Sequence, residues 1–163
     1  MDRTQGNIAN SSGNVLEQNV ISTFKTKGFE VVKYSFWNKN QNKYGGVPKG
    51  LLKNVPFESI YGHKGYTEFL LKSKKYNLEI RIECKWQQSA GSVDEKLPYL
   101  YLNCVESMLE KDIIIIIDGG GYKEGALKWI KESVRTRKYQ NSNMKNIQIM
   151  NIVEFMTWAN NNF

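Results

Sequence analysis

The sequence predicts an α/β fold in which a mixed central sheet is flanked by helices. Residues 77–87 alternate apolar and polar side chains, the period-two pattern of a half-buried strand. Residues 113–117 are five consecutive isoleucines, which indicate a strand buried on both faces beneath helices. Segments with the apolar spacing of amphipathic helices lie before, between and after these strands. This order of elements favours a sheet packed between helical layers.

The predicted helices carry an apolar stripe at helical spacing or a capping signal. They are residues 13–27, 92–109, 122–138 and a C-terminal helix that begins after Asn151. Gly28 follows the first of them, as is typical of a helix end. Glu154 stands three residues after Asn151 and completes the sequence pattern of a capping box.

The predicted strands are residues 29–36, 65–72, 77–87, 112–118 and 146–150. A short polar turn joins the second and third of them, which predicts an antiparallel hairpin. Residues 37–56 are rich in Asn, Lys and Gly and are predicted to form a long basic loop with room for a short hairpin. The expected order is therefore helix, three strands, helix, strand, helix, strand, helix.

The composition is that of one globular domain. The chain has 163 residues, 40% of them hydrophobic, which is enough for a sizeable core. We expect a flexible N-terminus over residues 1–12, which are polar and lack periodicity, and a single domain over residues 13–163. Cys84 and Cys104 lack the spacing of metal ligands and are predicted to be reduced thiols. No signal-like or membrane-spanning apolar stretch is present, so we expect a cytoplasmic protein without a membrane partner.

The positive charge is concentrated in two segments. The net charge is +7, and residues 25–53 carry seven basic residues against one acid, while residues 122–145 carry seven against two. Such segments suit a polyanionic partner such as nucleic acid, although solvated lysine-rich surfaces are an equally good interpretation. The candidate nucleic-acid contacts in them are Lys39, Lys43, Lys49, Lys123, Lys128 and Arg135.

The polar face of residues 77–87 carries the most specific chemical signal. Glu83 and Lys85 are two residues apart on that face, an arrangement suited to holding a metal ion and a water beside a phosphodiester. The competing interpretation is the ordinary polar side of an amphipathic strand. A second match to the same pattern, residues 94–96, falls at a predicted helix start, where acids are favoured by the helix dipole.

Two further acids support the first interpretation. Glu68 falls on the preceding strand of the same hairpin, and Glu17 lies beside the apolar stripe that contains Val20 and Phe24. A carboxylate near a core-facing stripe costs several kcal/mol unless it is paired or lies near a cation. Three acids and a lysine that are each unfavourable alone are consistent with a single site.

This set of residues resembles the PD-(D/E)xK nuclease superfamily. A helix glutamate, a strand acid, Glu-x-Lys on the next strand, then a helix and a buried strand occur in that order over residues 13–117. The run over residues 82–88 is similar to the motif strand of restriction-type endonucleases and Holliday-junction resolvases. The resemblance implies a restriction-endonuclease-like αβββαβ core. One departure is that Thr67-Glu68 stands where the family has a Pro-Asp pair.

The resemblance also implies roles for individual residues. Glu68 and Glu83 would bind Mg²⁺, with Mn²⁺ as a substitute, and the backbone carbonyl of Cys84 would be a third ligand. Lys85 would position or activate the attacking water. Such a site would hydrolyse DNA phosphodiester bonds as an endonuclease.

The resemblance leaves other roles and functions open. Glu17 would assist at the metal or organise the site, Gln87 would be an accessory group, and Glu58 is the alternative first acid. A structure-selective Holliday-junction resolvase is the alternative enzyme, and a non-catalytic DNA-binding or interaction module is the alternative from another class. A homodimer is an open expectation because cutting both strands often needs two copies in this superfamily.

Overall fold

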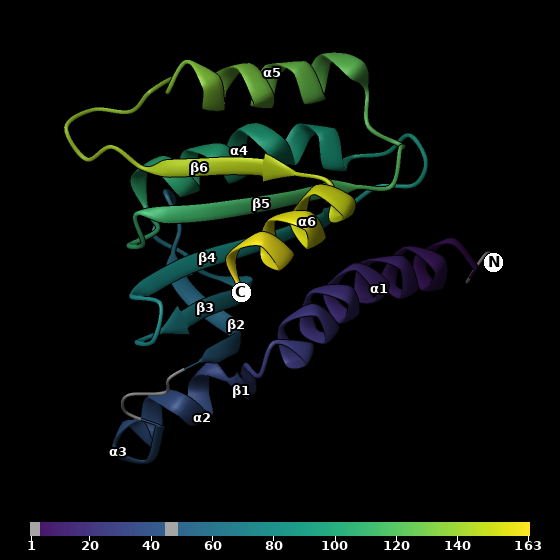
Figure 1. Ribbon diagram of the computed structural model, residues 1–163. Helices are drawn as coiled ribbons and strands as arrows, with labels where there is room; N and C mark the ends of the chain where they lie inside the picture. Colours follow the sequence, from purple (N-terminus) through teal and green to yellow (C-terminus); the bar gives the residue numbers. More distant parts are fainter. Residues whose placement is uncertain (1–3, 45–48) are drawn as a thin grey trace.

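The computed structural model describes residues 4–44 and 49–163, and the side chains of residues 14–42 and 49–163. In this described part the strands form a six-stranded sheet in the order β1-β2-β3-β4-β5-β6, with helices on both faces (Figure 1). The strands are β1 (Glu30–Lys33), β2 (Gly50–Glu58), β3 (Lys64–Ser73), β4 (Leu78–Trp86), β5 (Asp112–Asp118) and β6 (Asn146–Met150). The helices are α1 (Thr4–Thr26), α2 (Tyr34–Lys39), α3 (Gln41–Tyr44), α4 (Val93–Glu106), α5 (Glu124–Arg135) and α6 (Ile152–Asn162).

The sheet is mixed, as predicted. β3 pairs antiparallel with β2 and β4, whereas the other neighbouring strands pair in parallel. β1, β2, β4, β5 and β6 therefore run in the same direction, and their carboxyl-terminal ends lie at the same end of the sheet. The predicted α/β fold with a mixed central sheet between helices is confirmed.

Two hydrophobic clusters lie on opposite faces of the sheet. One packs α1 and α6 against the sheet and includes Phe24, Phe155 and Ile114. The other packs α4 and α5 against the opposite face and includes Leu97 and Ile130. The five isoleucines of β5 are all buried and alternate between these clusters, which confirms the prediction of a strand covered on both sides.

The ends of the first and last helices follow the sequence signals. Gly28 adopts a φ of +79°, a left-handed conformation that ends α1 at little steric cost. Asn151 accepts a hydrogen bond from the backbone N–H of Glu154, whose side chain accepts one in return, so the capping box is present. α1 begins at Thr4 rather than at residue 13; residues 1–3 lie outside the described part, and the flexibility expected of residues 1–12 stays a prediction.

The prediction of a long loop over residues 37–56 is wrong. The chain leaves β1 after Lys33, forms α2 and α3, and then runs through β2, while residues 45–48 lie outside the described part. β2 was overlooked because Asn54 and Pro56 interrupt its pattern. Asn54 has a φ of +56°, and Pro56 lies beyond the part of β2 that pairs with β1, where a strand tolerates a residue without an N–H.

The part of the polar face of β4 that carries Arg81 and Glu83 is buried, whereas Glu79 on the same face is exposed. Arg81 is only 3% exposed, and its Nη2 donates to Oε1 of Glu110 at 2.8 Å. Its Nη1 donates to the hydroxyl of Thr67 at 3.0 Å and, at 3.4 Å, to the carbonyls of Val55 and Pro56. One buried guanidinium therefore ties β4 to β2, to β3 and to the turn before β5.

No helix in the described part is long and apolar enough to span a membrane.

We predict that Glu110→Ala destabilises the protein because it leaves the Arg81 guanidinium buried without its carboxylate. The expected loss in the free energy of unfolding is about 3–5 kcal/mol, measured by urea unfolding. Glu132→Ala removes the carboxylate that pairs with Arg135 on the exposed face of α5 and is the matched control. Its urea midpoint should equal that of the wild type. A Glu110→Ala midpoint as high as that of the control would contradict the prediction.

Candidate active site

The candidate site lies where β3 and β4 separate. Their antiparallel ladder runs from Ser73 and Leu78 to Phe69 and Ile82 and stops there. At the next position an Oε2 atom of Glu68 accepts a hydrogen bond from the backbone N–H of Cys84 at 2.8 Å. A side-chain carboxylate therefore takes the place of a strand carbonyl at the point of the fork.

The alternation of side chains between the two faces of the sheet is broken at Glu68 of β3. Thr67 is buried beside Arg81 on the α4 side of the sheet, whereas Phe69 is buried in the cluster beneath α1. On β2, Asn54 lies between the partners of these two residues and has the left-handed φ noted above. Regular alternation would place Thr67 and Phe69 on the same face. The irregularity directs Glu68 sideways, toward β4.

Lys85 joins the two strand acids. Its Nζ lies 2.7 Å from Oε2 of Glu83 and 3.8 Å from Oε1 of Glu68. The side chain of Glu83 is 4% exposed, while those of Glu68 and Lys85 are 22% and 26% exposed. The structure thus brings these three predicted residues to one partly open point on the sheet.

Glu17 approaches this cluster from α1. Burial raises the pKa of its carboxyl, and Glu68 raises it further, while Lys53 and Lys85 act in the opposite direction. The predicted helix acid is therefore within electrostatic range of the strand acid and the lysine. Lys53 of β2 was not singled out from the sequence, because nothing there distinguishes it from the other lysines of residues 25–53.

Burial and mutual repulsion set the protonation of the site. Burial raises the pKa of Glu83, Lys85 lowers it, and Glu68 raises it, with the net result well above the ordinary value. Burial alone would lower the pKa of Lys85, but Glu83 and Glu68 outweigh it and hold the pKa above its ordinary value. Lys85 is therefore a permanent cation in this arrangement.

Gln87 supports the site from behind. Its side-chain nitrogen donates to the carbonyl of Gly121 at 3.0 Å and to Oδ1 of Asp94 at 3.4 Å, and its oxygen accepts from the N–H of Val93 at 2.9 Å. These contacts tie the end of β4 to the start of α4 and to the turn after β5. Gln87 is buried, and in the structure it connects these three segments through hydrogen bonds. Its accessory role at the site stays a prediction.

The structure separates Glu68 from its alternative, Glu58. Glu58 is exposed at the end of β2 and stands opposite Lys64 in the β2–β3 ladder. Neither Glu83 nor Lys85 owes its raised pKa to Glu58, whereas both respond to Glu68. Geometry therefore favours Glu68 as the first acid.

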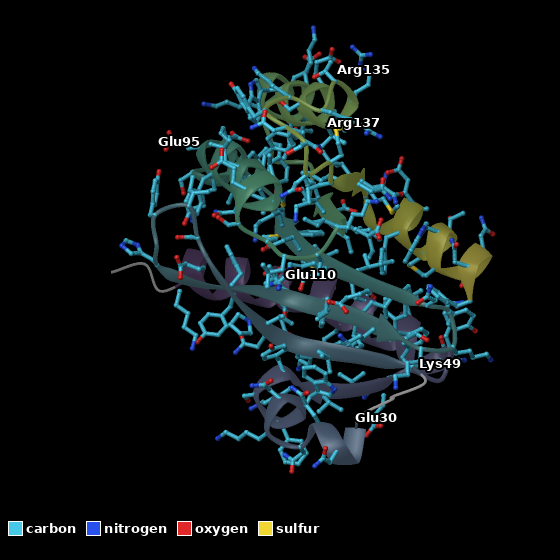
Figure 2. The ribbon with its side chains drawn as sticks, turned by 90° about the vertical axis from the view of Figure 1, so that its left-hand side faces the viewer. Glu30, Lys49, Glu95, Glu110, Arg135 and Arg137 are labelled. Atoms are coloured by element: carbon cyan, nitrogen blue, oxygen red, sulfur yellow. The ribbon has the colours of Figure 1, made fainter. Side chains whose placement is uncertain are left out.

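The candidate nucleic-acid residues lie in several environments. Nζ of Lys49 donates to the carbonyl of Lys27 at 2.8 Å and covers the ring of Phe29, and Arg135 is paired with Glu132. Figure 2 shows Arg135 at the top of the molecule and Lys49 low on another part of it. Lys39, Lys123 and Lys128 are exposed, as is the paired Arg135, whereas the side chain of Lys43 lies outside the described part.

The donor set fits a loosely held hard cation. No group of three or more His, Cys, Asp or Glu side chains is arranged around a common point in the described residues, so a closed metal cage is absent there. Mg²⁺ keeps several waters and is usually held by one or two carboxylates together with substrate phosphate. Glu68 and Glu83 are two carboxylates at the fork whose chemistry would suit such an ion. The Cys84 thiol is buried with the α1 cluster and has a raised pKa because burial disfavours the thiolate.

Comparison with known families supports this assignment of the fold. A family described as a PD-(D/E)XK nuclease superfamily domain matches residues 8–163. The chain belongs to the PD-(D/E)XK nuclease superfamily. The resemblance seen over residues 13–117 is confirmed and extends through the C-terminal helix of this nuclease-superfamily domain. No curated protein and no solved structure matches the chain significantly.

We predict that the free energy of unfolding of the metal-free protein falls as the pH rises. The pKa of the Glu83 carboxyl is raised from 4.5 to about 8 on folding, so the folded state binds this proton more tightly. The contribution of the group is complete below the unfolded value of 4.5 and is lost as the pH rises toward the folded value. In EDTA the free energy of unfolding should fall by about 3 kcal/mol between about pH 5.5 and about pH 8.5 through this group.

Urea unfolding of the wild type and of Glu83→Gln at the two pH values tests this expectation. The variant cannot ionise at position 83, so its pH dependence should be smaller by that amount. Identical pH dependence in the two proteins would contradict it.

Proposed function

We propose that this protein is a Mg²⁺-dependent endonuclease that hydrolyses phosphodiester bonds of DNA by metal-assisted attack of water. The observation that carries the proposal is the meeting of Glu68, Glu83 and Lys85 at the strand fork. Membership of the superfamily supports the same chemistry.

Glu68 and Glu83 would hold the metal together with the Cys84 carbonyl, and Mn²⁺ would substitute for Mg²⁺. When bound, such an ion stabilises charge on the attacking and leaving oxygens of an in-line displacement. Burial raises the pKa of the Glu83 carboxyl, and the neighbouring Glu68 carboxylate raises it further, so the two anions are unfavourable together without a cation. They are therefore suited to binding positive charge.

Lys85 would act as a cation and hydrogen-bond donor rather than as a base. A general base needs a pKa near the working pH, and that of Lys85 is raised by its two acidic neighbours. Its ammonium is partly exposed and can donate to a phosphate oxygen or to the attacking water. Glu17 on α1 would add negative charge near Glu68, and Lys53 would partly neutralise the charge of Glu17.

DNA would approach the sheet edge where β4 and β5 end. Lys123 follows β5 at this edge, since its backbone N–H donates to Oδ1 of Asp94 at the start of α4. We propose Lys123, Lys128, Lys39 and Lys43 as phosphate contacts. Lys49 and Arg135 are weaker candidates because both are already engaged.

A structure-selective resolvase and a non-catalytic DNA-binding or interaction module are the alternatives. The intact set of two acids and a lysine favours catalysis over the module. Incubation with supercoiled, linear, branched and single-stranded DNA, with and without Mg²⁺, separates the three. Cleavage confined to four-way junctions would assign the resolvase, and binding without cleavage would assign the module. A homodimer remains a proposal that cutting of both strands would favour.

We predict that Lys85→Ala lowers the rate of plasmid cleavage by roughly a thousandfold or more, because it removes the positive charge at the fork. DNA binding should be largely retained. Lys72→Ala is the matched control, since Lys72 lies 2.7 Å from Glu79 on the same two strands but at an exposed position. The control should cut at the wild-type rate. Cleavage by Lys85→Ala at the rate of the control would contradict the assignment.

We predict that chelation removes all cleavage. EDTA should stop the reaction, and excess Mg²⁺ or Mn²⁺ should restore it, as measured by conversion of supercoiled plasmid. Glu83→Ala should stay inactive in either metal while still binding DNA, because it loses a carboxylate from the metal site. Turnover in the chelator, or metal-restored turnover in Glu83→Ala, would exclude the proposed role of these acids.

A further inference from the structure

Tyr66 is a large, exposed aromatic side chain two residues before Glu68 on β3. It is 49% exposed, whereas the next residue, Thr67, is 1% exposed on the opposite side of β3. Gly65 also faces that opposite side, against the ring of Phe57. Tyr66 precedes Glu68 by two strand positions, so their α-carbons are separated by about 7 Å along β3.

A lysine completes the feature. Nζ of Lys64 lies 5.4 Å from the centroid of the Tyr66 ring, over its face. Lys64 makes no ion pair with another described residue, so its charge is available to an anion. An aromatic face and an ammonium group therefore follow one another along the strand that carries Glu68.

The turn that leads into this strand is held by hydrogen bonds on both sides. The turn is closed by the N–H of Ser59, which donates to the carbonyl of His63 at 2.8 Å. The same turn is held against α4, because the N–H of Ile60 donates to Oδ1 of Asn103 at 2.9 Å. A β-carbon at Gly65 would come within 2.8 Å of the Phe57 ring, so the close packing there depends on glycine. These contacts fix the position of the strand segment that carries Tyr66.

We propose that Lys64 and Tyr66 bind an unpaired nucleotide of the DNA substrate next to the bond that is cut. The proposal rests on the proposed function and defines its substrate class as DNA with an unpaired base beside the cleavage point. In a paired duplex both faces of a base are covered by its neighbours, so an exposed ring can stack only on a base that has left the helix. Lys64 supplies the charge that matches the phosphate of that nucleotide.

The chain contains a matched control for this pair. Tyr139 is 54% exposed, and Nζ of Lys138 lies 5.1 Å from its ring centroid. Lys138 and Tyr139 lie away from the fork, in the connection between α5 and the start of β6. The two pairs share their chemistry and differ in their distance from Glu68.

The test uses a duplex with one unpaired 2-aminopurine at a single-strand junction and a fully paired duplex with the same base. Binding is measured in EDTA, where no turnover is expected, and stacking is followed by quenching of 2-aminopurine fluorescence. We expect wild type and Tyr66→Phe to quench the unpaired probe. Tyr66→Ala should abolish the quenching and weaken binding of the unpaired probe about tenfold, with binding of the paired probe changed less than about twofold. Tyr139→Ala should behave as wild type.

Equal binding of the unpaired probe by Tyr66→Ala and Tyr139→Ala would overturn the proposal, as would equal weakening of both probes by Tyr66→Ala. Thermal melts of the variants separate loss of stacking from loss of folding, and Tyr66→Phe keeps the ring where alanine perturbs the strand. Cleavage in Mg²⁺ is scored separately. Cleavage without Tyr66-dependent stacking overturns this proposal alone, and stacking without Mg²⁺-dependent cleavage overturns the hydrolytic step alone.

Discussion

The hydrogen bond from the Cys84 amide to the Glu68 carboxylate is the contact on which the candidate site depends. The backbone N–H groups of a strand normally donate to carbonyls of the neighbouring strand. A buried N–H left without an acceptor would cost about 1–3 kcal/mol. Because Glu68 supplies the acceptor, β3 and β4 separate without leaving that N–H unsatisfied. The same contact places a carboxylate beside Glu83 and Lys85. The interaction that opens the sheet is therefore also the one that assembles the acids.

Lys85 neutralises part of the negative charge of the site, but the ionised form of Glu83 stays unfavourable. Burial raises the pKa of the Glu83 carboxyl, Lys85 offsets this only in part, and Glu68 raises the pKa further. A divalent cation would remove the repulsion, so the same feature that strains the metal-free protein favours metal binding. Behind the site, Arg81 and Glu110 form a second buried charge pair on the same face of β4. That pair holds β2 and β3 against β4 on one side of the fork, so that the other side can remain open.

The sequence predicts the parts of this arrangement that depend on local pattern. The alternation in residues 77–87 and the isoleucines of β5 indicate the sheet, and the spacing of Glu83 and Lys85 indicates the site. β2 escaped prediction because its bend at Asn54 removes the alternation on which strands are recognised. Long-range pairing escaped it as well. No local pattern links Arg81 to Glu110, and none marks Lys53 as the lysine within range of Glu17.

The irregularity at Asn54 and Glu68 connects these observations. A regular β3 would point Glu68 to one face of the sheet and would continue the ladder with β4, which would close the fork. Because the strand turns over there, Glu68 reaches β4, while Tyr66 before it projects away from the buried Thr67. One local deviation from strand geometry therefore decides both where the acids meet and the side of β3 on which Tyr66 lies. The left-handed residue Asn54, which obscures β2 in the sequence pattern, is thus part of the irregularity that brings Glu68 to Glu83 and Lys85.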